Sequence, residues 1–398
     1  MPRARPIHRR SRAPVFFASS LALATLTVAT VATAEPIRPT RDDEIVETLS
    51  TGFGERAEQR RLRSALAARP RDAALAVAMA KRELDQARAS GDPRFAGLAL
   101  AALSPWPDAA SAPDAVLLAR ATLQQYLHEF TASVATLQTL LARPSGSRNG
   151  QAWLTLATVL RVQGRFVDSD AACRQVERTS SRLYGSACLA ENASLRGDAA
   201  AARARFAALL AEPETSAATK AWLETSLAEL EQRDGRPREA ERAFRAALSA
   251  EPDAYATIAY ADLLIDQQRG REALALLAKW PRTDAVVLRL AIAGQQARSA
   301  AAAADAADMR ERIALANQRP GAEKFHGREQ AMFALLVEHD AHRALTLARG
   351  NVEQQREPLD LLVLARAARA SGDAAALAEV KALRASLGLH DRRLDGLL

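Results

Sequence analysis

The sequence predicts an all-α protein built from repeated pairs of antiparallel helices, and three observations support this prediction. Hydrophobic residues make up 48% of the 398 residues, which is too many for a disordered chain. Aromatic residues make up only 5%, which is too few for the dense core of a β-sandwich or barrel. Apolar residues recur at helical spacing, and the turn residues between them return about every 34 residues.

The N-terminal segment, residues 1–34, has the layout of a secretory signal peptide. Five arginines precede an uncharged run, 13–34, which ends in small residues before an acidic residue. We expect cleavage between Ala34 and Glu35, and therefore a periplasmic or secreted mature protein. Because the uncharged run is nearly long enough to span a bilayer, an uncleaved inner-membrane anchor is the alternative.

Removal of this segment changes the charge of the working protein. The formal net charge of +7 falls to +2, because the segment carries five arginines and no acidic residue. No later cluster of lysine and arginine is interleaved with aromatic residues, so we expect no nucleic-acid partner. Later apolar runs end at a charge before they reach about 18 residues, so we expect no transmembrane segment in the mature chain.

The clearest repeat unit covers residues 150–182 and is predicted to form two helices separated by Gly164. The apolar face of the first helix consists of Trp153, Leu156, Ala157 and Leu160. The matching face of the second helix consists of Phe166, Ser169, Cys173 and Val176. Each helix alone would expose an apolar stripe to water, so the pair must bury that stripe against itself and against neighbouring pairs.

These residues resemble the tetratricopeptide repeat, whose unit is a pair of antiparallel helices. The family has a large–small pair in the first helix, a glycine near the turn and a small residue in the second helix. Leu156–Ala157, Gly164 and Ser169 match this order, while Cys173 stands where the family usually has an aromatic residue. The same order recurs downstream at Leu189–Ala190, Gly197, Ala202 and Phe206, at Leu227–Ala228, Gly235, Ala240 and Phe244, and at Tyr260–Ala261, Leu290–Ala291 and Leu364–Ala365.

The resemblance implies a right-handed superhelical solenoid of about nine units, with first helices on the concave face and second helices on the convex face. After the signal peptide it divides the chain into capping helices at 35–72, the repeat array at 73–391 and a C-terminal cap at 392–398. The aromatic residues of the seams are then structural; they include Trp153, Phe206 and Phe244. Where the glycine or the large–small pair is missing, the phase is open by a few residues.

No catalytic motif occurs in the sequence, so we expect a protein that is not an enzyme, with no catalytic residue and no cofactor. Glycine-rich phosphate loops, paired-histidine zinc helices, CxxC pairs and nucleophile elbows are missing. His339 and His342 have a spacing that could hold a metal, but no third and fourth ligand can be named, so we expect no metal site there. The isolated histidines are expected at the surface; they are His128, His326 and His390.

The repeat phase places Tyr184, Trp222 and Tyr255 at the same early position of three successive first helices. This position points away from the seam of each helix pair and toward the concave groove, so we expect the three rings to anchor a protein or peptide partner. Polar residues of the same face are expected to orient that partner; they are Arg161, Glu191, Glu229 and Asp262. An error in the phase would place some of the rings in the seams instead.

The two cysteines, Cys173 and Cys188, are expected on antiparallel neighbouring helices of successive units. We therefore predict a disulfide between them in the exported protein, worth about 3 kcal/mol on the chain-entropy description. The alternative is a pair of buried, reduced thiols that fill the core.

Together these observations predict an exported scaffold that binds a protein or peptide, as part of a cell-envelope assembly, transport or secretion complex. The alternative is a substrate-targeting subunit of an envelope enzyme such as a wall-cleaving transglycosylase. Because the repeats continue to the last residues of the sequence, we expect no lysozyme-like catalytic domain in this chain.

The signal peptide gives the first testable prediction. Intact-mass measurement on protein from the periplasmic fraction should give a chain that begins at Glu35. Membrane-bound protein that still carries residues 1–34 would contradict cleavage and establish the anchor.

Overall fold

The computed structural model describes residues 52–398 apart from 93, 214 and 319–326. Backbone contacts divide the chain into two units, Met1–Glu55 and Arg56–Leu398. The predicted signal peptide and its cleavage site at Ala34 and Glu35 lie outside the described residues. None of the described helices combines the length and the apolar character that a membrane crossing requires.

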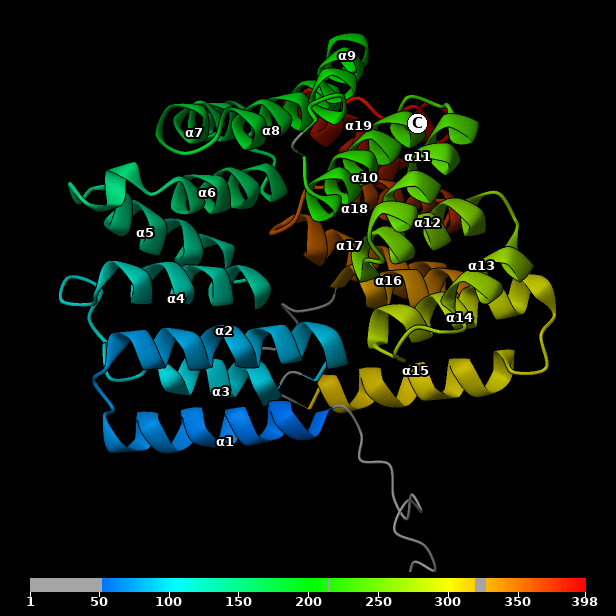
Figure 1. Ribbon diagram of the computed structural model, residues 1–398. Coiled ribbons are helices and arrows are strands. Elements are labelled where there is room, and N and C mark those ends of the chain that lie inside the picture. Colours follow the sequence, from blue (N-terminus) through cyan, green and yellow to red (C-terminus); the bar gives the residue numbers. More distant parts are fainter. Residues whose placement is uncertain (1–51, 93, 214, 319–326) are drawn as a thin grey trace, which may run out of the picture. The chain divides into compact units, whose positions relative to one another are not determined.

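Every regular element in the described residues is a helix (Figure 1). The helices are α1 (Gly52–Ala68), α2 (Ala73–Ser90), α3 (Arg94–Ala102), α4 (Asp114–Tyr126), α5 (Phe130–Leu141), the 3₁₀ turn η1 (Gly146–Arg148), α6 (Gly150–Val162), α7 (Phe166–Thr179), α8 (Arg182–Leu195), α9 (Ala199–Leu210), α10 (Ala217–Arg233), α11 (Pro237–Ala250), α12 (Ala254–Asp266), α13 (Gly270–Leu277), α14 (Asp284–Ala297), α15 (Ala302–Ala316), α16 (Gly327–Leu336), α17 (Ala341–Val352), α18 (Pro358–Ala370), α19 (Ala374–Leu387) and α20 (Arg392–Asp395). The predicted all-α fold is confirmed.

Nine successive helix pairs, from α2–α3 to α18–α19, make up most of the described residues. One residue with positive φ lies in the turn inside each pair, because the chain must reverse there within a few residues. These residues are Gly91, His128, Gly164, Gly197, Gly235, Gln268, Arg298, His339 and Gly372. Four of the nine are not glycine, which is why the glycine signal fades in parts of the sequence.

Close contact within each pair depends on small residues at the middle of the first helix. Ala157 and Ala228 are fully buried, so the partner helix can approach the backbone directly. The buried hydroxyl of Ser169 donates a hydrogen bond of 2.8 Å to the carbonyl oxygen of Ala157. Ser133 makes the same bond to Ala121 one unit earlier, also at 2.8 Å. The repeat phase is therefore visible in hydrogen bonds as well as in packing.

The aromatic residues expected in the seams stabilise the array by burial. Phe206 and Phe244 are fully buried, and each contributes about 2 to 3 kcal/mol of hydrophobic free energy. Trp153 is only half-buried: it packs against the core, and its indole N–H donates to the carbonyl oxygen of Ser147 at 2.9 Å. At the C-terminal end Leu394 is fully buried, and Leu398 packs against the same core.

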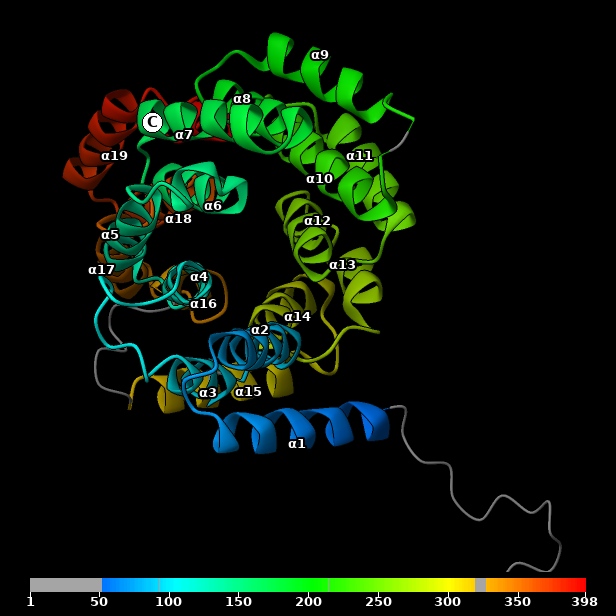
Figure 2. The same cartoon turned by 60° about the vertical axis from the view of Figure 1, so that its left-hand side comes forward.

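The first helices of the central pairs lie on the inner side of the superhelix, and the second helices lie outside. Figure 2 shows this for α10 and α12, which are closer to the centre than α11 and α13. The same figure shows α6 inside α7. Side chains on the inner faces of successive first helices can therefore surround a common space.

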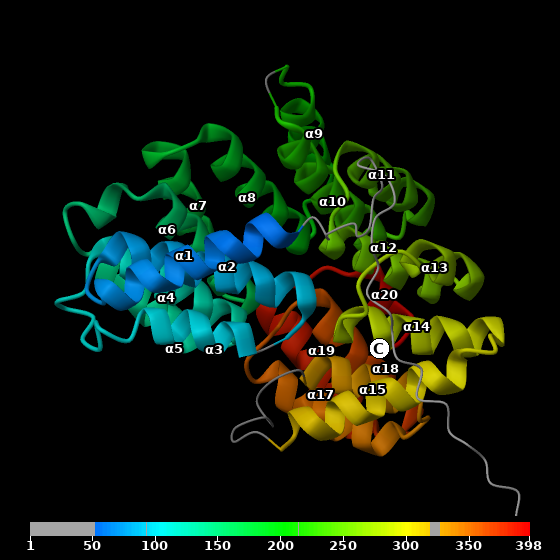
Figure 3. The ribbon, with the colours of Figure 1, turned by 60° about the horizontal axis from the view of Figure 1, so that its bottom comes forward.

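Later helices return to contact the turns of earlier pairs, so the superhelix closes on itself within the unit. The backbone N–H of Arg356, just before α18, donates to the carbonyl oxygen of Val162 in α6 at 2.7 Å. The N–H of His390, just before α20, donates to Leu195 in α8 at 2.7 Å. Figures 1 and 3 show the red C-terminal helices lying among helices from earlier parts of the chain.

Glycines in the turns of the earlier pairs lie against the returning C-terminal segments. The position that a side chain would take at Gly164 lies 2.6 Å from a methyl carbon of Leu387, so alanine there would force Leu387 to move. At Gly372, which also has positive φ, nothing lies within 4 Å. Gly164 therefore serves both the turn and the close approach of α19, whereas Gly372 serves the turn alone.

Two histidines that were expected at the surface take part in the contact between the C-terminal segments and the earlier pairs. The ring of His128 is hydrogen-bonded to the amide of Gln355 at 2.9 Å, although 227 residues separate them in sequence. His390 is half-buried and lies against Gly197. The expectation was wrong for both, because nothing local in the sequence indicates the return of the chain. His326 lies outside the described residues.

Candidate functional site

Two adjoining cavities lie between the inner faces of the central helices and the start of α18. The first, of about 320 Å³, is lined mainly by α6, α8 and α10. The second, of about 300 Å³, is lined by α10, α12, α14, α16 and α18. Five residues line both and join them; they are Glu229, Arg233, Tyr255, Glu357 and Pro358. We refer to the two cavities together as the inner cavity.

Two of the three rings predicted for the groove reach the inner cavity. Trp222 lines the first cavity, and Tyr255 lines both cavities with 61% of its surface exposed. These two rings also line a third cavity of about 300 Å³ together with Glu251 and Asp253. Tyr184 is 39% exposed and packs on Trp222 with ring centroids 5.7 Å apart.

None of the three rings is buried in the seam of a helix pair, although Trp222 is partly covered by the core. Their placement therefore agrees with the predicted repeat phase, while binding of a partner by these rings stays a prediction. The hydroxyl of Tyr184 lies 3.2 Å from that of Thr219, which links α8 to α10.

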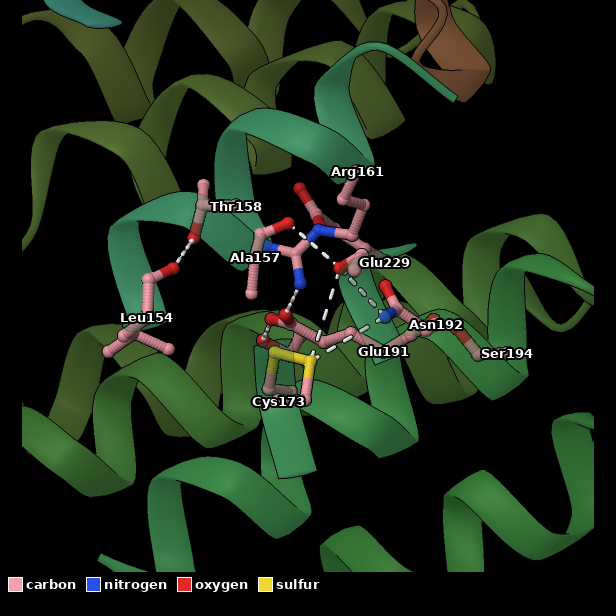
Figure 4. A network of polar contacts seen from close by, with 12 residues as sticks. Leu154, Ala157, Thr158, Arg161, Cys173, Glu191, Asn192, Ser194 and Glu229 are labelled. Atoms are coloured by element: carbon pink, nitrogen blue, oxygen red, sulfur yellow. Dashed lines mark hydrogen bonds and ion pairs between the residues drawn. A yellow bond between two sulfur atoms is a disulfide. The ribbon is translucent and has the colours of Figure 1, made fainter. Parts of the chain in front are cut away.

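The polar residues predicted for the same face are engaged with other residues of the chain. Arg161 forms an ion pair with Glu191 (Figure 4). The other carboxylate oxygen of Glu191 accepts a hydrogen bond of 2.7 Å from Ser226. Asp262 accepts two hydrogen bonds from Arg289, at 2.9 and 2.8 Å. These residues hold neighbouring first helices together, and a role in orienting a partner stays a prediction.

Glu229 and Tyr255 form a hydrogen-bonded pair at the junction of the two cavities. The hydroxyl of Tyr255 donates to Glu229 at 2.6 Å. Desolvation by the surrounding walls raises the pKa of Glu229. The negative charge of Glu229 raises the pKa of Tyr255 well above its usual value, so the phenol stays protonated and continues to donate this bond.

Charged residues from later pairs complete the wall, and none of them was predicted from the sequence. Arg328 in α16 donates to Asp360 at 2.6 Å and to Glu357 at 2.5 Å. Arg366 in α18 forms an ion pair with Asp266 of α12 at 2.9 Å. No local signal marks these residues, because only the return of α16 and α18 brings them to the inner cavity.

The two cysteines lie where the repeat phase predicted them. The structure joins Cys173 of α7 to Cys188 of α8 by a disulfide, with the Cα atoms 5.7 Å apart. Both residues are buried, and the side-chain amide of Asn192 beside them donates to Ser169 and to Asp170 at 2.9 Å each. Oxidation of the pair in the cell stays a prediction.

Of the two histidines considered as metal ligands, His339 lies in a turn and His342 lies in the first turn of α17. His339 has a φ of 57° between α16 and α17, and both His339 and His342 are exposed. Within the described ranges, no group of three or more His, Cys, Asp or Glu side chains is placed to hold a metal ion.

Comparisons with known proteins found one family match and similar solved structures. A family description of the tetratricopeptide repeat matches residues 231–291, from the end of α10 into α14. A solved structure described as a human IFIT1 dimer with PPP-AAAA aligns over 74% of this chain and 69% of that chain, with 14% identity and a TM-score of 0.44. A tetratricopeptide repeat protein from Parabacteroides merdae ATCC 43184 aligns over 63% of this chain and 97% of that chain, with 14% identity and a TM-score of 0.35. No curated protein matches the sequence significantly.

Residues 231–291 of the chain are therefore similar to the tetratricopeptide repeat. The matched segment contains the same helix pair, the same turn and the same buried small residues as the pairs on either side of it. Arrays of this kind are in general protein-interaction scaffolds, and their specificity depends on the side chains of the inner and outer faces.

The cysteine pair gives the second testable prediction. Thiol labelling of the exported protein, denatured without reductant, should modify neither Cys173 nor Cys188, and reduction beforehand should make both reactive. Labelling of two thiols without reduction would show that the exported protein carries free cysteines.

Proposed function

We propose that the mature protein is an exported, non-enzymatic scaffold that binds a segment of a partner protein at the inner cavity. Tyr184, Trp222 and Tyr255 are the proposed anchors, and the partner belongs to a cell-envelope assembly, transport or secretion complex. The tetratricopeptide fold supports protein binding in general terms. The signal-like residues 1–34 support the location.

The observation that carries the proposal is the row of partly exposed rings on three successive first helices. Large rings are normally buried in a helical array, yet Tyr255 keeps 61% and Tyr184 keeps 39% of its surface exposed. Tyr and Trp supply much of the contact energy at protein interfaces, because they combine a large apolar area with a polar group. Two of the rings, Trp222 and Tyr255, also border cavities of about 320 and 300 Å³.

Site-specific photo-crosslinking in intact envelopes gives the third testable prediction. A photoreactive residue at Thr158, which lines the first cavity, should form an adduct with a partner protein. The same residue at Val167, which is 72% exposed on the outer helix α7, is the matched control and should form none. Replacement of the three rings by alanine should reduce the Thr158 adduct at least about tenfold, because interface anchors are often worth 2 kcal/mol or more.

Thermal melting of the same variants separates binding from folding. Tyr255→Ala should lower the stability by only about 1 kcal/mol, because the ring is 61% exposed but its hydroxyl donates a hydrogen bond to Glu229. Trp222→Ala should cost somewhat more, because that ring is partly covered by the core. An undiminished adduct in a folded variant that lacks all three rings would move the binding site elsewhere.

A further inference from the structure

The arginines of the inner cavity are paired with carboxylates, with one exception. Arg161, Arg289, Arg328, Arg366 and Arg393 all line the inner cavity and all form ion pairs, with Glu191, Asp262, Asp360, Asp266 and Asp391 respectively. Arg233 lines both parts of the inner cavity and forms no ion pair with any described residue. Its charge therefore lacks the partner that every other arginine of this wall has.

Arg233 is the last residue of α10 and only 9% of its surface is exposed. One terminal nitrogen donates to the hydroxyl oxygen of Ser194 at 2.9 Å. Its Nε is buried and has no hydrogen-bond partner. Desolvation by burial lowers the pKa of the guanidinium of Arg233.

The two carboxylates of the chain that act on Arg233 electrostatically do not pair with it. Glu229 lies one helical turn earlier on α10, but its carboxylate accepts the hydroxyl of Tyr255. Asp391 is occupied by Arg393, which donates to both of its oxygens, at 3.0 and 2.7 Å. A planar guanidinium binds a carboxylate through two parallel hydrogen bonds, and Arg233 has donors left for such a bond.

We propose that Arg233 is the binding site for the carboxylate of an Asp or Glu side chain in the partner segment. The proposal rests on binding at the inner cavity and adds the chemistry of the ligand. The stem of the acidic side chain would lie against the apolar part of the second cavity, formed by Ile258, Met332 and Leu336. The carboxylate would reach the junction of the two cavities, where it completes the set of ion pairs along the wall.

The stability of the free protein tests whether Arg233 is a ligand-binding group or a structural one. Arg233→Met keeps an apolar stem of similar length and removes an unpaired buried charge, so its melting temperature should equal or exceed that of the wild type. Arg289→Met is the matched control and should melt lower, because it leaves the half-buried carboxylate of Asp262 without its partner. A clear decrease for Arg233→Met would overturn the proposal and make Arg233 a structural cation at the end of α10.

Defined peptides test the ligand. The probes are acetylated, amidated five-residue peptides of alanine with a central glutamate or glutamine, and a glutamine peptide with a free C-terminus. The glutamate peptide should bind wild-type protein at least tenfold more tightly than the amidated glutamine peptide, and Arg233→Met should remove this difference. Equal binding of the two, including none, would overturn the proposal. Preference for the free C-terminus would assign a terminal carboxylate instead of a side chain.

The crosslinking experiment distinguishes failure of this inference from failure of the proposed function. If Arg233→Met forms the Thr158 adduct as well as the wild type, while the variant without the three rings does not, then the inner cavity binds a partner without the help of Arg233. A loss of the adduct in both variants, with melting temperatures maintained, is the expected result.

Discussion

The return of the last helix pairs onto the turns of the central pairs is the contact on which the site depends. Two backbone hydrogen bonds mark it, from Arg356 to Val162 and from His390 to Leu195, at 2.7 Å each. Because both partners of each bond are backbone groups, no side-chain rotamer can change the bond. These bonds therefore fix the position of α18 and α20 against α6 and α8. Without them the inner faces of the central first helices would form an open groove, and Glu357 and Pro358 would not line it.

Closure has an electrostatic consequence, because it brings charges from distant pairs into a confined space. Burial of an unpaired charge is unfavourable in free energy. In the wall of the inner cavity this free energy is offset because arginines form ion pairs with carboxylates of other helices. Arg366 and Asp266, which are 100 positions apart in sequence, are joined at 2.9 Å in this way. The pairing holds the turns together and leaves Arg233 as the one arginine of this wall without an ion pair to a described residue.

The local part of the fold could be predicted from the sequence, because it depends on short-range patterns. Leu156–Ala157, Gly164 and Ser169 specify one helix pair, and the structure contains that pair with the predicted phase. Turns at Gln268 and Arg298 lack the glycine signal, because residues other than glycine adopt positive φ there. At those turns the sequence does not define the boundary between the two helices to within a few residues.

The cavity itself could not be predicted, because it depends on contacts between residues far apart in sequence. Tyr255 and Trp222 were identified from the phase alone, since both lie on first helices. Arg328 and Glu357 were missed, because they join the site only when α16 and α18 return to it. His128 and His390 were expected at the surface for the same reason.

Hydrogen–deuterium exchange of two backbone amides tests the central contact most directly. The N–H groups of Arg356 and His390 lie in connections before α18 and α20, and each has its hydrogen-bond acceptor on a distant helix. If the superhelix is closed in solution, both amides should exchange at least about a hundredfold more slowly than in the unfolded chain. Exchange at the unfolded rate, while the amides within α6 and α18 stay protected, would show that the pairs form but the superhelix remains open.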